Sequence, residues 1–509
     1  MEKVNYKNRL FDTKSLILFL LTLLFRTLVL PEFLLAQQRG NAALPNIVLI
    51  NVDDLGWKDL GFMGSTYYET PNLDQLAKEG MVFRHAYAPA ANCAPSRACL
   101  MSGMNTPKHG VYTVDNPDRG HEKTRKIIPT ANRVFLADSI YILAEMFRDK
   151  GYINGTFGKW HIGEDPKNRG FHVNVGGGRH GNPGKNGYFS PYTINFIENG
   201  PDGEYLTDRL TQEAVGFIED YKDQPFFLYL PFYSVHTPIT GKPELMAKYE
   251  NKPGSNGQDR ADYAAMVSSV DENVGKLLKT LDQYGLRETT LLIFTSDNGG
   301  IRDISAQDPL RAGKGSYYEG GIRVPLIIRW PGKIDPGSET DFPVTHMDFY
   351  PTFQRAIQED VSVSGRFDGM DLTPIFNQKK LEERPLFWHF PIYLQAYNPK
   401  EDGGRDPLFR TRPGSVVRKG KWKLHHYFED DDYELYDLER DPGERNNLIE
   451  AFPEIKDQLR SLLNNWRSSV NAPVPDQRNP NYDEEFEKQL IKEKLGKIGH
   501  DEIGTQGDD

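Results

Sequence analysis

Residues 46–54, Asn-Ile-Val-Leu-Ile-Asn-Val-Asp-Asp, decide the fold class of this chain. An almost continuously apolar run is followed at once by a pair of carboxylates. Continuous rather than alternating hydrophobicity is typical of a strand buried on both faces, and such strands belong to parallel sheets. We therefore expect residues 46–52 to form a central strand, with Asp53 and Asp54 at its carboxyl end.

The same pattern recurs along the chain up to residue 300. Apolar runs at residues 152–157, 226–233 and 290–295 are followed by polar residues, namely Lys159-Trp160-His161, His236 and Asp297-Asn298. Stretches with helical spacing of apolar residues lie between the runs, at residues 137–148, 208–220 and 263–284. Alternating strands and helices predict an α/β fold, in which ligands bind at the carboxyl ends of parallel strands. The polar clusters should therefore gather at one edge of one sheet.

The pattern changes after residue 380. A strand at residues 324–330 and a helix at 347–357 complete a larger domain, which we place at residues 45–380. Short segments at 386–390, 415–418, 422–427 and 434–437 predict an antiparallel sheet, followed by a helix at 451–466. The predicted fold is a large, mainly parallel sheet flanked by helices, with a smaller α+β domain at residues 385–470. A polar tail at 471–509 carries a further candidate helix at 484–495.

The N-terminus has the layout of a secretory signal. An apolar run at residues 15–25 follows four basic residues, Lys3, Lys7, Arg9 and Lys14. A membrane anchor is the alternative, but Arg26, Pro31 and Glu32 interrupt the run before the roughly 20 apolar residues that a span needs. We expect residues 1–36 to be removed and the protein to be exported, to the periplasm or beyond, without a stable membrane anchor.

The charge and the cysteines restrict the partners and the chemistry. A net charge of -11 disfavours nucleic acid and anionic membranes as partners, so an anionic substrate needs a local cluster of cations. The only cysteines, Cys93 and Cys99, are too few for a disulfide framework. A bridge between them is one explanation of the pair. If the chain is helical from Pro95 onward, however, the two side chains point apart and a disulfide would be strained.

Acidic residues follow two of the predicted strands at equivalent positions. Asp53-Asp54 and Asp297-Asn298 supply carboxylate and amide oxygens from distant parts of the chain. Such hard ligands suit Ca²⁺ better than Zn²⁺, which favours His or Cys. A single Asp pair after a strand can also be a turn or a helix cap. Two such pairs at one sheet edge favour a metal site.

Residues 93–103, Cys-Ala-Pro-Ser-Arg-Ala-Cys-Leu-Met-Ser-Gly, carry a specific motif. The segment resembles the signature of the sulfatase family, in which Cys-x-Pro-Ser-Arg precedes two free positions, apolar residues, a small hydroxyl residue and Gly. Ser102 stands where Thr is usual. A buried Cys before a helix N-terminus is the structural alternative, but it leaves the Pro-Ser-Arg spacing unexplained.

The resemblance covers nearly all of residues 45–450. Residues 158–161, Gly-Lys-Trp-His, are similar to the family's second signature, although Asn154 replaces a usual Ser or Thr. Further similar blocks lie at residues 236–238, 296–299, 313–325 and 434–448. The resemblance implies an alkaline phosphatase-like fold and a sulfuric ester hydrolase.

The resemblance also implies a mechanism. A dedicated maturation enzyme would oxidise Cys93 to formylglycine (3-oxoalanine), whose hydrated aldehyde attacks sulfur and carries the sulfate in a covalent sulfoenzyme intermediate. One Ca²⁺ ion would be bound by the oxygen at position 93 together with Asp53, Asp54, Asp297 and Asn298. Arg97, Lys159 and Lys314 would neutralise the sulfate oxygens in the transition state.

The family pattern assigns proton transfer to two histidines. His236, with Lys314, would protonate the departing alcohol oxygen. His161 would remove the proton whose loss expels sulfate and restores the aldehyde. Either histidine by itself can be a structural hydrogen-bonding residue. Trp160 is expected to pack rather than to take part in the chemistry.

A long segment at residues 164–192, rich in Gly, Asn and Pro, is the candidate region for substrate recognition. Arg179 and His180 within it are the candidate substrate-binding residues, although a solvated loop has a similar composition. A second candidate wall consists of Trp388, His389, Tyr393, Tyr397 and Arg405. We expect the substrate to be a sulfated polysaccharide or oligosaccharide, such as an algal galactan, ulvan or a glycosaminoglycan.

Two other functions are compatible with these patterns. A phosphatase or phosphodiesterase of the same superfold acts on esters of similar shape, but commonly uses Ser or Thr and zinc-type ligands. A non-catalytic sulfoglycan-binding protein would keep the fold without turnover. The Cys signature weighs against the first, and the complete set of expected catalytic residues weighs against the second.

Overall fold

The computed structural model describes residues 44–358, 367–379 and 381–496. The signal predicted at residues 1–36 and the end of the predicted tail lie outside the described residues. All elements named below belong to the part of the chain from Pro45 onward. No helix of the described chain combines the length and the hydropathy needed to cross a membrane.

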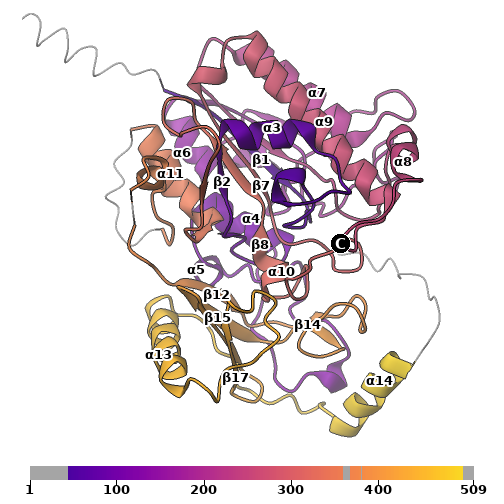
Figure 1. Cartoon of the computed structure of the whole chain (residues 1–509), viewed down its shortest axis with the longest axis vertical. Coiled ribbons are helices and arrows are strands. Elements are labelled where there is room, and N and C mark those ends of the chain that lie inside the picture. The colour runs from indigo at the N-terminus through magenta and orange to yellow at the C-terminus, as the bar shows by residue number, and fades with distance from the viewer. Residues whose placement is uncertain (1–43, 359–366, 380, 497–509) are drawn as a thin grey trace, which may run out of the picture. The chain divides into compact units, whose positions relative to one another are not determined.

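The apolar runs form neighbouring parallel strands. They are β1 (Asn46–Val52), β4 (Ile153–Phe157), β6 (Phe226–Pro231) and β7 (Thr290–Ser296), in the order β7-β1-β6-β4. Strand β1 pairs in parallel with both β6 and β7, and Val52 lies opposite Ser296. Every residue of β1 is buried, as a strand covered on both faces requires. The predicted parallel centre of the sheet is confirmed (Figure 1).

Further strands extend this sheet to eight and make it mixed. Strand β5 (Val173–Val175) continues the parallel part beside β4. On the other side, β9 (Leu326–Arg329) runs antiparallel to β7 and is followed by β2 (Met81–Phe83) and β10 (Ser338–Thr340). Strand β5 lies inside the segment predicted to be a long loop.

The strand predicted at residues 324–330 is divided in two. Pro325 separates β8 (Arg323–Val324) from β9, because a proline has no N–H to donate to a sheet. Strand β8 belongs to a small separate sheet with β3 (Ala86–Tyr87) and β11 (Val344–Thr345).

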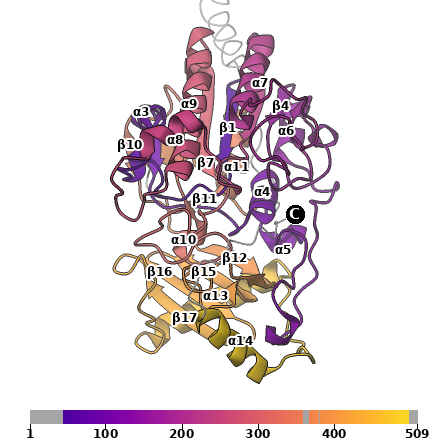
Figure 2. The same cartoon turned by 90° about the vertical axis from the view of Figure 1, so that its right-hand side faces the viewer.

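Helices cover both faces of the large sheet (Figures 1 and 2). On one face, α3 (Pro71–Glu79), α7 (Leu206–Tyr221), α8 (Pro243–Tyr249) and α9 (Ala261–Gln283) pack together. On the other face lie α4 (Cys93–Ser102), α6 (Leu143–Asp149) and α11 (Phe349–Ala356). Alternate side chains of β6 reach the two groups, since Phe226 packs in the core with Phe217 of α7 while Phe227 packs against Phe147 of α6.

The helix predicted at residues 137–148 begins only at Leu143. The Glu145 side chain accepts a hydrogen bond from the N–H of Ile142 at 2.8 Å, and this contact caps the first turn. Residues 138–140 form a turn and bend instead. The helical spacing of apolar residues therefore starts several residues before the helix itself.

The C-terminal part contains the predicted antiparallel sheet. Its strands are β12 (Leu386–Phe390), β15 (Gly414–Lys419), β16 (Trp422–Tyr427) and β17 (Asp432–Asp437), in the order β12-β15-β16-β17. Helix α13 (Pro453–Ser469) covers one face with Leu459 and Leu463. A short pair, β13 (Leu394–Gln395) and β14 (Phe409–Thr411), lies apart from this sheet. The fold class is confirmed, while the domain boundaries at residues 380 and 385 stay a prediction.

The described part of the tail returns to the body of the protein. Arg478 forms an isolated bridge with Ile127, and Asn479 Nδ2 donates to the Arg125 carbonyl at 2.7 Å. Helix α14 (Glu484–Gly496) then forms close to the predicted range. The remaining short helices are η2 (Gly61–Met63), α5 (Thr106–His109), η3 (Glu122–Thr124), η4 (Pro166–Arg169), η5 (Arg287–Thr289), α10 (Glu319–Ile322), η6 (His346–Asp348) and α12 (Thr373–Phe376).

Candidate active site

The carboxyl ends of β1 and β7 bring the two acidic pairs together. The N–H of Asp54 donates to Asp297 Oδ1 at 3.2 Å, and Asn298 Nδ2 donates to Asp54 Oδ1 at 2.8 Å. Asp53 precedes them at the end of β1, and all four side chains are buried. The expectation that these residues meet at one sheet edge agrees with the structure. We call Asp53, Asp54 and Asp297 the carboxylate cluster.

Helix α4 places Cys93 beside the carboxylate cluster. One carboxylate oxygen each from Asp53 and Asp54 and the Cys93 sulfur, all atoms that could bind a metal, lie within 4.8 Å of one another. One helical turn further on, Ser96 Oγ donates to the Asp297 carbonyl at 2.5 Å and Arg97 Nε donates to Asp297 Oδ2 at 2.8 Å. The Pro-Ser-Arg spacing therefore attaches the first turn of α4 to the end of β7.

The two cysteines are both free and buried. Cys99 Sγ lies 3.2 Å from Nε2 of His109, within α5. As expected from their positions on one helix, the two sulfurs face different surroundings and form no bridge.

Three buried cations complete the site. Lys159, which follows β4, donates from Nζ to Asp53 Oδ2 at 2.7 Å, and Lys314 donates from Nζ to Asp54 Oδ2 at 2.9 Å. Arg97 also donates from Nη1 to the Lys159 carbonyl at 2.8 Å. The formal charges of the three carboxylates and the three cations therefore sum to zero when all six groups are ionised.

Burial and charge shift the pKa values in this cluster. Burial raises the pKa of Asp53 well above its usual range, with Asp297 and Asp54 adding to the rise against the opposing effect of Lys159. Burial acts in the same direction on Asp54, but Lys314 and His236 outweigh it and lower the pKa of Asp54. Burial also raises the pKa of the Cys93 thiol despite nearby lysines. An unmodified Cys93 is therefore a neutral thiol and a weak nucleophile.

His236 presents one ring nitrogen to the carboxylate cluster. Its Nδ1 donates to the Thr237 carbonyl at 2.7 Å, which assigns the hydrogen to Nδ1, while Nε2 lies 3.7 Å from Asp54 Oδ2. Burial and the charge of Lys314 lower the pKa of His236 to about 4. The imidazole is therefore neutral near pH 7, with a lone pair on Nε2.

His161 is held tightly by the segment that follows β5. Its backbone N–H donates to the Gly178 carbonyl at 2.9 Å, and Gly181 lies directly against its ring. A Cβ added to Gly181 would come within 2.6 Å of His161 Cε1, so only glycine allows this approach. Burial and the charges of Lys159 and Arg97 lower the pKa of His161 well below its usual value. This imidazole is neutral as well.

Several polar atoms of the site lack a hydrogen-bond partner within the described chain. They are Asp53 Oδ1, Asn298 Oδ1, His161 Nδ1 and His236 Nε2. Buried polar atoms without partners are rare in folded proteins unless a water, an ion or a ligand satisfies them. Two of these atoms are oxygens of predicted metal ligands, and two are imidazole nitrogens of the predicted proton-transfer residues. The donor set therefore fits a cation together with a polar ligand.

The predicted substrate-binding residues lie beside His161 rather than in the carboxylate cluster. Arg179 is exposed, with its guanidinium 6.0 Å from the ring centroid of Phe135 and its Nη1 3.8 Å from Glu164 Oε1. His180 is half-buried, and its Nε2 lies 3.4 Å from Asn195 Oδ1. Both residues lie between Gly178 and Gly181, the two glycines that contact His161.

Sequence patterns did not single out Phe196, which lies next to this segment. The Gly176 N–H donates to its carbonyl at 2.8 Å, and its side chain is 46% exposed. A lone aromatic residue between Asn195 and Ile197 gave no signal of its position beside a candidate site.

The second candidate wall is largely core. Trp388, His389 and Tyr393 are buried, and Trp388 Nε1 donates to the Ala88 carbonyl at 2.9 Å. They join the C-terminal sheet to the rest of the protein, so they do not offer a surface to a substrate. Trp160 is also buried and packs against Phe171, as expected of a packing residue.

Comparison with known proteins agrees with the geometry. A family model described as Sulfatase matches residues 45–358, and one described as N-sulphoglucosamine sulphohydrolase, C-terminal, matches residues 313–469. A sulfatase from Formosa agariphila is 32% identical over 89% of this chain and 94% of its own length. The human N-acetylgalactosamine-6-sulfatase is 29% identical over 85% of this chain and 87% of its own.

A solved structure extends the likeness to three dimensions. Ps i-CgsB in complex with k-i-k-neocarrahexaose superposes with a TM-score of 0.69 at 29% identity, covering 89% of this chain and 100% of that one. The chain belongs to the sulfatase family, because the family model spans most of its length. It is an enzyme that hydrolyses sulfate esters, with the alkaline phosphatase-like fold that the sequence motifs implied.

Proposed function

We propose that this sulfatase uses a formylglycine made from Cys93 by a maturation enzyme, binds one Ca²⁺ ion, and removes sulfate from a sulfated poly- or oligosaccharide. The observation that supports this most strongly is the grouping of Asp53, Asp54 and Cys93 within 4.8 Å of one another. The grouping is buried and surrounded by cations, as the transfer of an anionic group requires.

The donor set favours Ca²⁺ as the metal. Asp53, Asp54, Asp297 and Asn298 would hold it through oxygens, of which Asp53 Oδ1 and Asn298 Oδ1 lack a partner in the described chain. When bound, Ca²⁺ would act as a Lewis acid and offset both the burial and the repulsion from Asp297 and Asp54 that raise the pKa of Asp53. A thiol is a soft ligand that suits Ca²⁺ poorly, whereas a side chain bearing oxygen at position 93 suits it well. The metal ligands therefore support oxidation of Cys93.

The lysines would hold the sulfate group. Lys159 donates to Asp53 and Lys314 donates to Asp54, so the two lysines contact different carboxylates of the cluster. Both lysines are buried. A bound divalent cation would add two positive charges to a cluster that already holds as many cations as carboxylates, and the resulting positive site would attract an anionic ester. Arg97 donates to Asp297 and to the Lys159 carbonyl, so we propose that it acts on the sulfate by fixing these two residues.

The histidines would move the protons. His161 is neutral and has no partner for Nδ1 within the described chain, so it suits the role of a base that accepts a proton. His236 must first gain a proton at Nε2 before it can protonate the leaving oxygen. The negative charge of a bound sulfate ester raises the pKa of a nearby imidazole and favours that protonation.

Substrate recognition would take place beside His161. Arg179 and His180 supply positive and hydrogen-bonding groups, and Phe196 supplies an exposed aromatic face. Sugar rings have apolar faces as well as polar edges, so this mixture suits a carbohydrate. The relative solved with k-i-k-neocarrahexaose supports an oligosaccharide substrate. Algal galactans and ulvan are our preferred candidates, and glycosaminoglycans come next.

The decisive experiment examines Cys93 in active protein produced together with a formylglycine-generating enzyme. The peptide that contains both cysteines should show the mass change of formylglycine at Cys93 and an unmodified thiol at Cys99. The variant Cys93→Ala should lose essentially all sulfate release from a panel of sulfated oligosaccharides, while Cys99→Ala, the matched control, should keep most of it. Full activity with an unmodified thiol at Cys93 would disprove the mechanism.

A phosphate ester panel separates the family assignment from the related phosphatases. We expect sulfate release to exceed phosphate release on paired aryl esters, in Ca²⁺ and in Zn²⁺. Binding of sulfated sugars without any sulfate release would instead indicate a non-catalytic protein.

We also propose that the protein is exported after removal of residues 1–36. The basic and apolar pattern of the N-terminus supports this proposal. N-terminal sequencing of protein recovered from outside the cytoplasm should begin close to residue 37. An intact Met1 on that protein would contradict cleavage.

A further inference from the structure

We propose that Arg410 is a positioning residue that holds Lys314 where it would contact the sulfate group. We also propose that the tail fixes the position of Arg410 through its contact with Arg412. The inference rests on the proposed role of Lys314 in holding sulfate. It concerns a side chain from the C-terminal part of the protein, outside the motifs that marked the site.

The backbone around Lys314 is held by three neighbours. The Lys314 N–H donates to the Gly300 carbonyl at 2.9 Å, and the N–H of Gly315 donates to the Ala91 carbonyl at 2.7 Å. The Lys314 carbonyl in turn accepts a hydrogen bond from Arg410 Nη1 at 3.2 Å. The first two partners are backbone groups close to Asn298 and Cys93. Of these three partners, Arg410 bonds through its side chain, so a substitution can remove its hydrogen bond to the Lys314 carbonyl.

The Arg410 guanidinium is itself closely confined. Its carbon lies 3.3 Å from the ring centroid of Tyr397, and its Nε donates to the Gln395 carbonyl at 2.9 Å. Gly315 has a φ of +86°, and a Cβ added there would lie only 2.9 Å from Arg410 Nη1. A glycine is therefore needed both for the backbone conformation and for the approach of the guanidinium. Arg410 is 5% exposed, so surrounding atoms restrict the orientation of its guanidinium.

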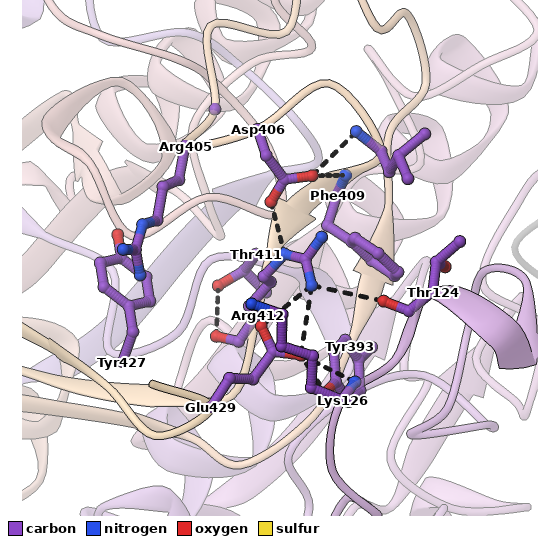
Figure 3. A network of polar contacts seen from close by, with 12 residues as sticks. Thr124, Lys126, Tyr393, Arg405, Asp406, Phe409, Thr411, Arg412, Tyr427 and Glu429 are labelled. Atoms are coloured by element: carbon purple, nitrogen blue, oxygen red, sulfur yellow. Dashed lines mark hydrogen bonds and ion pairs between the residues drawn. The ribbon is translucent and has the colours of Figure 1, made fainter. Parts of the chain in front are cut away.

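Strand β14, which carries Arg410, is anchored by Arg412 (Figure 3). Arg412 Nε donates to Asp406 Oδ2 at 2.6 Å, and Nη1 donates to Glu429 Oε2 at 2.9 Å. Asp406 Oδ1 accepts the N–H of Phe409 at 3.1 Å, so one carboxylate joins Arg412 to the start of the strand. Figure 3 shows the Arg412 guanidinium at the centre of these contacts.

The tail supplies another partner of Arg412. Nη2 donates to Oε1 of Glu487, a residue of α14, at 2.8 Å, and Tyr482 also donates to Glu487 at 2.8 Å. Glu487 is buried although it belongs to a mostly exposed helix. The contacts thus run from Glu487 through Arg412 and β14 to Arg410 and Lys314. A loss of any of them should loosen the placement of Lys314.

The test compares Arg410→Gln with Arg467→Gln. Arg467 is a matched control, because its guanidinium is also buried over an aromatic ring, Phe428 at 5.5 Å, but its partners are His426 and Asn464. We expect Arg410→Gln to lower kcat by roughly 10- to 100-fold, as small misplacements of a binding group do. Arg467→Gln should change kcat less than about threefold, because it shares no partner with Lys314. All rates are divided by the formylglycine content at Cys93, so incomplete maturation does not affect the comparison.

A double-mutant cycle with Lys314→Gln shows whether Arg410 acts through Lys314. If it does, adding Arg410→Gln to Lys314→Gln should cost less than about twofold in single-turnover rate. Where the Lys314→Gln rate is too low to measure, Arg410→Lys in otherwise wild-type protein replaces the cycle. Its kcat should be at least about threefold higher than that of Arg410→Gln, because a lysine is longer than a glutamine and can still donate to the carbonyl. Equal losses in both backgrounds, or a normal kcat in Arg410→Gln, would overturn the inference. Absence of turnover in the wild-type protein would instead count against the proposed function.

The contribution of the tail is tested by Glu487→Gln. We expect a two- to fivefold lower kcat, since the substitution weakens one of several contacts of Arg412. Glu485→Gln is the control on the same helix, because Glu485 is exposed and contacts Lys488. If the two variants have the same kcat, the tail does not secure Arg410, and that part of the inference is wrong.

Discussion

Replacing Lys423 by Met should destabilise the folded protein by about 3–5 kcal/mol. The Lys423 side chain is completely buried, and its Nζ lies 2.9 Å from Glu319 Oε1 and 3.1 Å from Glu444 Oε1. The substitution keeps most of the apolar stem but removes the cation that both carboxylates share. Two negative charges then remain buried in a medium of low polarity, which is the costly way to break an ion pair.

Lys421→Met is the matched control for this prediction. Lys421 lies two residues away, and its Nζ is 2.7 Å from Asp437 Oδ2, but its side chain is 35% exposed. Because water screens this pair, its loss should cost less than about 1 kcal/mol. Thermal unfolding should therefore separate the two variants by roughly 3–5 °C for a chain of this length. Equal midpoints would refute the argument that burial, rather than ion-pair distance, determines the cost.

Three further outcomes follow from the structure. First, the ion pair between Lys423 and Glu319 should make stability depend on pH. Burial raises the pKa of Glu319, but Lys423, Arg323 and Arg418 outweigh burial and lower this pKa from 4.5 to about 2. A carboxyl group whose pKa is lower in the folded state stabilises the fold at pH values above its pKa in the unfolded chain. The loss of unfolding free energy in Lys423→Met, measured by urea unfolding, should therefore be complete above about pH 4.5 and become smaller toward pH 2. Second, Ca²⁺ at about 100 times its dissociation constant should stabilise the wild-type protein by about 2.7 kcal/mol, and Asp297→Ala should abolish that thermal shift; an unchanged shift would exclude Asp297 as a ligand. Third, Phe196→Ala should raise KM for a sulfated oligosaccharide by roughly tenfold and leave KM for an aryl sulfate unchanged. Phe452→Ala, which changes another exposed aromatic residue in the C-terminal part, should affect neither KM.

Sequence patterns predicted those features that depend on local hydrophobicity. The continuous apolar runs predicted β1, β4, β6 and β7, and the parallel arrangement then placed Asp53 and Asp297 at one edge. Where the local pattern competed with a specific contact, the prediction was less exact. The helix expected from residue 137 begins at Leu143 because Glu145 caps it there, and Pro325 divides an apolar run into strands of two sheets.

Features that depend on packing between distant segments could not be predicted. Arg410 lies in a stretch with several arginines, and only the folded structure shows that its guanidinium reaches the Lys314 carbonyl. Trp388 and His389 were expected to line a substrate wall, but both are buried, Trp388 against Tyr87 of β3 and His389 near Trp466 of α13. Phe196 is the opposite case: its sequence position has no distinguishing feature, but the structure shows an exposed aromatic residue next to Gly176 and Gly178.

The burial of Cys93 would limit the time available for its proposed modification. The side chain is 1% exposed once Asp297 and Lys314 have joined the site, and these residues follow Cys93 by more than two hundred positions. At a synthesis rate of about 5–20 residues per second, they are added roughly 10–45 s after Cys93. If formylglycine is made only on the unfolded chain, the oxidising enzyme competes with folding during and after that interval. Molecules that fold before they are oxidised would keep an inaccessible thiol. The active fraction of a purified preparation would therefore equal the fraction of chains that were oxidised before they folded.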